Sequence, residues 1–127
     1  MEEGQWAIAR LPPDAPIPGW AESAVFSCLT RNRDELSIVC AESAVPEGVR
    51  REGGWAMLKL AGPFPFTEVG ILSAFLAPLA AEGVSIFAIS TFDTDYVLVR
   101  RTDLARALEA LESARGANPA SRGRAGA

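Results

Sequence analysis

The chain has 127 residues, 49% of them hydrophobic and 22% charged, with a formal net charge of −4 at pH 7. This length fits one compact domain, or two small modules that share a core. The arginines are scattered and form no basic stripe, which argues against nucleic acid as a partner. No apolar run approaches the roughly 20 residues that cross a bilayer, and the first residues are acidic, so we expect a soluble, cytoplasmic protein that does not bind a membrane.

Histidine is absent from the sequence. It is the commonest general base and the commonest metal ligand, so most hydrolytic triads and zinc sites are excluded. The sequence also shows no glycine-rich phosphate loop and no cysteine beside a general base, and we therefore expect no catalytic residues, no metal site and no cofactor. The enzymatic alternative is a carboxylate pair such as Asp93 and Asp95, which requires a turn to bring together side chains that alternate along a strand.

Residues 5–11 alternate apolar and polar side chains and predict a first strand, which two prolines end. The proline-rich segment 12–18 cannot form a long helix, so we expect an extended loop with at most one turn around residues 18–22. Its expected role is to carry Ile17 and Trp20 onto the sheet.

Two further strands are predicted at residues 24–30 and 35–40, joined as a β-hairpin by the polar turn 31–34. Cys28 and Cys40 lie one in each of these strands. In a cytosolic chain both are expected to be reduced and buried as small hydrophobes. Pairing of the two strands would allow a disulfide between them but does not imply one.

Residues 41–54 contain several charged residues, a proline and paired glycines, and predict a solvated loop with at most a turn or two of helix. Residues 55–60 then predict a strand. A helix follows, with Thr67 as its expected N-cap and Gly83 as its C-terminal stop. Pro78 lies within this helix and is expected to kink its last turn.

Residues 84–91 are apolar on both faces and predict an interior strand, which implies a partner sheet or a second subunit on the face that helices leave open. The FDTD turn leads into a strand at residues 96–100. Thr102 is the expected N-cap of a last helix, whose apolar residues recur at helical spacing. Residues 116–127 are small and polar and are expected to be a disordered tail.

From residue 55 onward the pattern is β-α-β-β-α, so the fold class is α+β and the arrangement ferredoxin-like (βαββαβ), with the first and third strands of this stretch side by side. The signature Ser90-Thr91-Phe92-Asp93-Thr94-Asp95-Tyr96 stands between two of these strands. Together with the rest of residues 62–101, it resembles an ACT domain, the small amino-acid-binding regulatory module. More closely, it resembles bacterial tandem ACT-like proteins and the ACT modules of animal arginine sensors.

The resemblance covers roughly residues 5–114 and implies tandem ACT-like units: a degenerate first unit at residues 1–54, with loops in place of helices, and a well-formed ACT domain at residues 55–115. It also implies a homodimer and an amino acid ligand lying between ACT units. The ligand would contact the loop after the first strand of the domain, a strand of a neighbouring unit, and the signature. Carried onto this sequence, the implied ligand-binding residues are Phe66, Thr67, Glu68, Val69, Gly70, Ile71, Val84, Ser85, Ile86, Thr91, Phe92 and Asp95.

Physical chemistry supports some of these positions. A helix N-terminus offers free N–H groups to a ligand carboxylate, and Glu68 and Asp95 are candidate acceptors for an ammonium or guanidinium group. Three of the implied residues also have a purely structural interpretation. Glu68 can be a first-turn helix residue, Asp95 a turn residue and Gly70 a residue that packs the helix on the sheet. Ser85 and Thr91 can equally be edge-strand residues with satisfied hydroxyls, and Phe92 a core residue.

We therefore expect a non-enzymatic, amino-acid-binding sensor that acts by shifting the population of its assembled or ordered states. The acidic side chains of the implied site favour a basic or simple neutral ligand. The alternative is a protein-interaction module that keeps the ACT-like fold and has lost its ligand.

Overall fold

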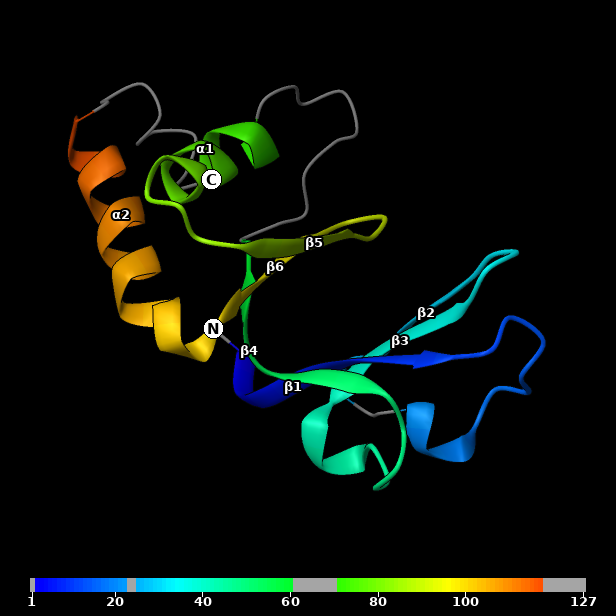
Figure 1. Cartoon of the computed structure of the whole chain (residues 1–127). Helices are drawn as coiled ribbons and strands as arrows, with labels where there is room; N and C mark the ends of the chain where they lie inside the picture. The colour runs from blue at the N-terminus through cyan, green and yellow to red at the C-terminus, as the bar shows by residue number, and fades with distance from the viewer. Residues whose placement is uncertain (1, 23–24, 61–70, 118–127) are drawn as a thin grey trace. The chain divides into compact units, whose positions relative to one another are not determined.

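The computed structural model describes residues 2–22, 25–60 and 71–117 and divides into two compact units (Figure 1). The N-terminal unit is Glu3–Trp55, and the C-terminal unit begins at Ala56 and includes the first two residues of the chain. Within the described residues, no helix is long and apolar enough to cross a membrane.

The N-terminal unit consists of short strands joined by single helical turns. Its elements in chain order are β1 (Glu2–Leu11), the 3-10 turn η1 (Gly19–Ala21), β2 (Cys28–Arg31), β3 (Leu36–Ala41), the 3-10 turn η2 (Glu42–Ala44) and the first half of β4 (Arg51–Lys59). The strand order is β2-β3-β1-β4. This is the ferredoxin-like order with one turn in place of each helix.

The register of the hairpin separates the two cysteines. β2 and β3 pair antiparallel with Cys28 opposite Val39, so Cys40 is one residue beyond the partner of Cys28. Because adjacent residues of a strand project to opposite faces, the two thiols lie on opposite sides of the sheet. Both cysteines are free, and Cys40 is buried whereas Cys28 is half-buried.

The core of the N-terminal unit lies on one face of its strands. The buried residues of this face are Ala7, Ala9, Ala21, Leu36, Ile38, Cys40 and Val45. Trp20 packs against this cluster as predicted, but Ile17 is 56% exposed, so its predicted burial is wrong. The extended backbone at Pro18, which is half-buried, leaves the side chain of the preceding residue on the solvent side.

Two strand boundaries differ from the prediction by four residues. β2 begins at Cys28 instead of residue 24, and Val25 is 71% exposed. β4 begins at Arg51 instead of Trp55, through the paired glycines that we interpreted as loop. The main-chain N–H of Arg10 donates to the carbonyl oxygen of Arg50 at 2.9 Å, so pairing with β1 overrides the low strand propensity of glycine here.

The C-terminal unit places two helices against three strands. It contains the second half of β4, α1 (Ile71–Ala81), β5 (Ile86–Ser90), β6 (Asp95–Arg100), the 3-10 turn η3 (Arg101–Asp103) and α2 (Leu104–Ala117). The strand order β4-β6-β5 confirms that the first and third strands of this stretch lie side by side. It also makes β5 an edge strand, so the prediction of an interior strand at residues 84–91 is wrong. Its buried core combines strand residues with residues of both helices, namely Ala56, Leu60, Val97, Val99, Leu79, Val84 and Ala107.

The helix ends of this unit follow the sequence only in part. Gly83 has a positive φ of 71°, which glycine adopts without strain, and it ends α1 as predicted. Pro78 lies inside α1, and the predicted cap Thr67 falls outside the described residues. Thr102 is not an N-cap, because the chain enters α2 through η3, where the N–H of Leu104 bonds to the carbonyl oxygen of Arg101.

Candidate ligand-binding site

The signature forms the turn between β5 and β6, and the Thr91 side chain closes that turn. The Thr91 N–H and hydroxyl both donate to the carbonyl oxygen of Thr94, at 2.8 and 3.0 Å. The Thr94 N–H in turn donates to the Thr91 hydroxyl at 3.2 Å. Thr91 is therefore a turn-forming residue, and its hydroxyl already has partners within the chain.

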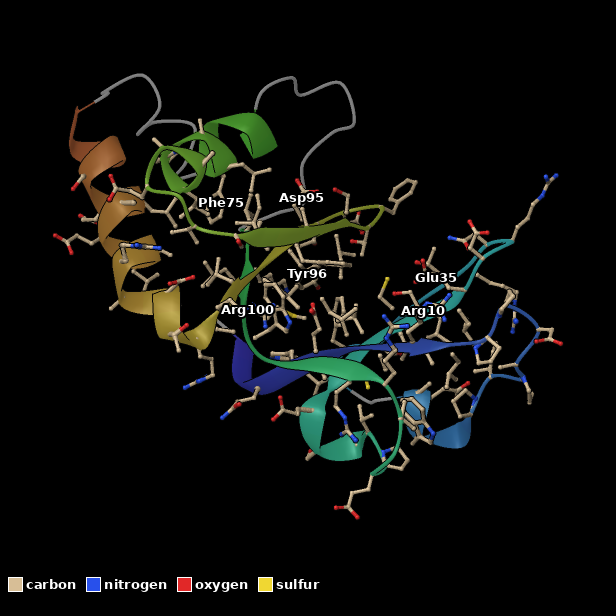
Figure 2. All side chains as sticks on the ribbon, viewed as in Figure 1. Arg10, Glu35, Phe75, Asp95, Tyr96 and Arg100 are labelled. Atoms are coloured by element: carbon tan, nitrogen blue, oxygen red, sulfur yellow. The ribbon has the colours of Figure 1, made fainter. Side chains whose placement is uncertain are left out.

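Asp95 follows the turn as the first residue of β6 (Figure 2). Its carbonyl oxygen accepts the Leu60 N–H at 2.9 Å, and it pairs across the strands with Ser90. Its half-buried carboxylate has no hydrogen-bond partner among the described residues. The turn is thus held by Thr91, and the Asp95 carboxylate remains available to a ligand.

The exposure of the turn agrees with a contact site. Phe92 is 76% exposed, so its interpretation as a core residue is wrong. A large aromatic side chain at the tip of a hairpin can cover a ligand or enter a partner's pocket.

The stretch Val84–Ser85–Ile86 lies at the opposite end of β5. Val84 is 5% exposed and its N–H bonds to the Leu79 carbonyl oxygen at the end of α1, so it is a core residue. Ser85 is exposed, and Ile86 is half-buried and pairs with Val99 of β6. Of these three residues, Ser85 is the most accessible to a ligand.

The described part of the predicted site is therefore split in two. The five residues of β5 separate Ser85 from Thr91, which corresponds to about 20 Å along an extended strand. One unit does not bring these two groups together around one small ligand.

The remaining predicted residues fall in the connection from β4 to α1. Phe66, Thr67, Glu68, Val69 and Gly70 lie outside the described residues, and Ile71 is the first residue of α1. The connection leaves β4 just after Leu60, whose N–H bonds to Asp95. Leu60, the last described residue before this connection, is thus tied to the start of β6.

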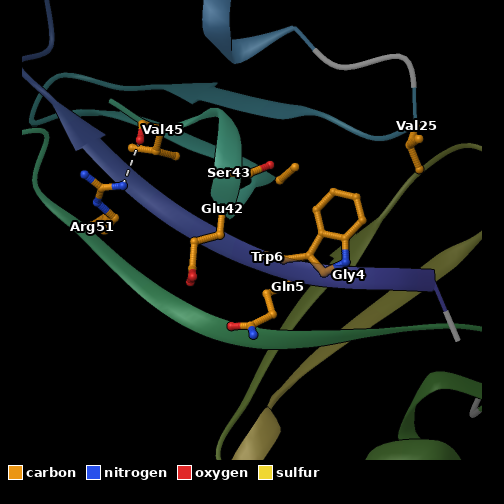
Figure 3. A pocket seen from close by; sticks show the side chains of 9 residues that line it. Gly4, Gln5, Trp6, Val25, Glu42, Ser43, Val45 and Arg51 are labelled. Carbon is orange, nitrogen blue, oxygen red and sulfur yellow. Dashed lines mark hydrogen bonds between the residues drawn. The ribbon is translucent and has the colours of Figure 1, made fainter. Parts of the chain in front are cut away.

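A concave feature lies wholly within the N-terminal unit, and the sequence did not predict it. It is a cavity of about 680 Å³ between the start of β1 and η2, lined by Gly4, Gln5, Trp6, Val25, Ala41, Glu42, Ser43, Val45 and Arg51 (Figure 3). Its polar residues come from three separate segments, and Glu42 and Arg51 fall in what we interpreted as a solvated loop. No sequence signal joins these segments. Among the described residues, no group of three or more Asp, Glu or Cys side chains could hold a metal ion.

Comparison with known families assigns the fold of the C-terminal unit. The model of the ACT domain matches residues 50–113, which is half of the chain, and a model of a separate N-terminal domain matches residues 4–48. The chain belongs to the ACT domain family. This confirms the resemblance and the α+β class, and it makes the protein a member of a family of regulatory small-molecule-binding modules.

Individual relatives of this ACT protein match to different extents. Protein Atu0741 of Agrobacterium tumefaciens has a solved structure that is 44% identical, with a TM-score of 0.83, covering 87% of this chain and 83% of that one. Protein VC0802 of Vibrio cholerae shares the fold. Its solved structure is 17% identical, with a TM-score of 0.69, covering 89% of this chain and 85% of that one. The human cytosolic arginine sensor for mTORC1 subunit 1 is 37% identical over 59 residues, which is 46% of this chain but 18% of the sensor.

Proposed function

We propose that this ACT protein is a non-enzymatic, cytoplasmic sensor in which two copies of the chain hold an amino acid between their C-terminal units. The observation that carries the proposal is the division of the described site residues between the two ends of β5. A ligand that needs both groups must take one from each of two units.

The edge position of β5 supports the pairing of two copies. β5 is the outermost strand of the C-terminal unit, and residues 84–92 contain no charged residue and no proline. Natural edge strands usually carry such residues to prevent pairing with another chain. Antiparallel pairing of β5 with β5 of a second copy would place Ser85 of one chain beside the Thr91–Asp95 turn of the other, twice per dimer.

The chemistry of the site favours an amino acid with a neutral or basic side chain. The Asp95 carboxylate can accept a hydrogen bond from an ammonium or guanidinium group, and Glu68 supplies a second carboxylate on the connection to α1. One relative, the cytosolic arginine sensor, is similar over 59 residues. We therefore place basic amino acids first among the candidate ligands.

A thermal-shift screen of the purified chain against the twenty amino acids tests this function. A ligand that binds only the folded state at 100 times its Kd adds about 2.7 kcal/mol to the free energy of unfolding, which raises Tm by several degrees. Asp95→Ala should abolish the rise and Asp93→Ala, an exposed substitution in the same turn, should retain it. If no amino acid raises Tm, the alternative gains support: a protein-interaction module that keeps the fold without a ligand.

A further inference from the structure

We propose that the cavity of the N-terminal unit is a second small-molecule site, and that it takes an organic cation with an apolar body, such as a primary amine. This site is separate from the β5–β6 turn and does not depend on the function proposed above. Its volume of about 680 Å³ lies within the range of about 300–1,000 Å³ typical of ligand pockets.

The wall formed by η2 is fixed by the chain itself. The Arg51 guanidinium donates to the carbonyl oxygens of Val45, at 2.9 Å, and of Pro46. At the other end of the turn, Glu42 Oε1 accepts the Gly54 N–H at 2.6 Å (Figure 3 shows Arg51 and Glu42). A wall held in this way loses little conformational entropy when a ligand binds.

One carboxylate, Glu42, and one guanidinium, Arg51, line the cavity. The Arg51 guanidinium donates hydrogen bonds to two main-chain carbonyl groups, which orient it toward the turn. Glu42 uses one carboxylate oxygen for Gly54, and no bond joins its other oxygen to a described residue. A half-buried carboxylate with a free oxygen recognises a cation, because charge-assisted hydrogen bonds are stronger than neutral ones.

The rest of the lining supplies an apolar surface with a few neutral polar groups. Trp6, Val25 and Val45 contribute apolar side chains, and Gln5 and Ser43 expose an amide and a hydroxyl at the rim. Trp6 is 2% exposed, and its Nε1–H has no hydrogen-bond partner among the described residues. An indole in this wall gives a direct spectroscopic signal of occupancy.

Nuclear magnetic resonance of the full-length chain, labelled with ¹⁵N, tests the proposal. The probe is 2-phenylethylammonium, and its uncharged and anionic counterparts are 2-phenylethanol and phenylacetate. We expect a saturable shift of the Trp6 indole resonance and of the Ser43 amide with the cation alone. The indole of Trp20, which packs in the core and does not line the cavity, should not move.

Matched variants locate the response. Glu42→Gln, which keeps an oxygen for Gly54, should weaken binding of the cation about tenfold or more. Glu47→Gln, an exposed carboxylate outside the cavity, and Asp95→Asn in the β5–β6 turn should leave the titration unchanged. Ser43→Trp at the exposed rim should fill the cavity and block binding, and it keeps the test decisive if Glu42→Gln unfolds.

Three results would overturn the proposal: no saturable shift of these resonances, equal shifts with the alcohol and the amine, or full retention of binding in Ser43→Trp. Loss of the response in Asp95→Asn would place the amine at the β5–β6 turn and would also overturn it. Failure of the amino acid screen leaves this titration unaffected, so the two proposals fail separately.

Discussion

The N–H of Leu60 donates a hydrogen bond of 2.9 Å to the carbonyl oxygen of Asp95. This bond ties the end of β4 to the start of β6 through the main chain alone. The Asp95 side chain takes no part in it and has no partner among the described residues. The backbone of Asp95 therefore has a structural role, and its carboxylate is free for the ligand role proposed above.

Substitution of Asp95 by Asn should accordingly leave the fold intact. We expect Tm in the absence of ligand to change by less than about 2 °C, because surface substitutions without a lost contact usually stay within about 0.5 kcal/mol. Thr91→Ala, which removes the hydroxyl that closes the turn, should lower Tm, and Thr91→Ser should restore it. Thermal denaturation of the four proteins checks both expectations. A large loss of stability in Asp95→Asn would contradict the assigned division of roles.

The Glu42 carboxylate lies over the backbone of Gly53 and Gly54. A Cβ added at Gly53 would clash with Glu42 Oε1, so Gly53→Ala must displace the carboxylate from the Gly54 N–H. We expect a loss of about 1 kcal/mol in the free energy of unfolding. Gly19→Ala, at a position with open space and no positive φ, should be nearly neutral.

A double-mutant cycle tests whether the clash with Glu42 causes the loss of stability in Gly53→Ala. In a Glu42→Ala background the carboxylate is absent, so Gly53→Ala should cost much less than in the wild type. Urea denaturation gives all four free energies. Equal costs in both backgrounds would show that Gly53 matters for another reason.

The Arg31 side chain holds the proline-rich loop in place through hydrogen bonds to its main chain. Its guanidinium donates to the carbonyl oxygens of Pro13 and Ala15, the second at 2.8 Å. Arg31→Lys cannot reproduce this fork and should cost about 1 kcal/mol, a modest value because the contacts are exposed. Arg33→Ala in the adjacent turn is the control and should be neutral. Hydrogen exchange of the Ala15 amide should become faster in Arg31→Lys. An unchanged exchange rate would contradict the role of Arg31 in stabilising this loop.

The two cysteines should behave independently. Because they lie on opposite faces of the sheet, a reductant should not change Tm, and a thiol reagent should modify half-buried Cys28 before buried Cys40. Rapid formation of an intramolecular disulfide in the native protein would contradict the observed register.

Burial raises the pKa of the Cys40 thiol above its ordinary value of 9.0. The unfolded chain therefore releases the Cys40 proton at a lower pH than the folded chain. The stability that this difference contributes is complete below pH 9.0 and falls as the pH rises above it. Free energies of unfolding measured between about pH 8 and pH 10.5 should decline less steeply in Cys40→Ala than in the wild type. Identical slopes would contradict the shift.

The elements that the sequence predicted well have local causes. The β2–β3 hairpin is one, because the Asn32 side chain accepts the N–H groups of Asp34 and Glu35 at 2.8 and 2.9 Å. The end of α1 is another, since Gly83 alone supplies the positive φ that stops the helix. Chemistry of this kind is visible within a few residues of sequence.

The boundaries and contacts that the sequence did not predict depend on distant partners. β4 runs through Gly53 and Gly54 because β1 pairs with it, and the cavity of the N-terminal unit joins four segments that no local pattern connects. The signature was found in the turn where the resemblance placed it. Its distance from Ser85 followed only from the extent and register of β5.

The measurement that tests the central claim most directly is complementation between two inactive variants. Ser85→Trp should block one half of the shared site and Asp95→Ala the other, so neither protein alone should bind the amino acid found in the screen. Mixed and re-equilibrated at equal concentration, they should form heterodimers with one intact site each, and calorimetry should recover about a quarter of the wild-type binding capacity. No recovery, in a mixture shown to contain heterodimers, would contradict a site shared between two copies of the chain.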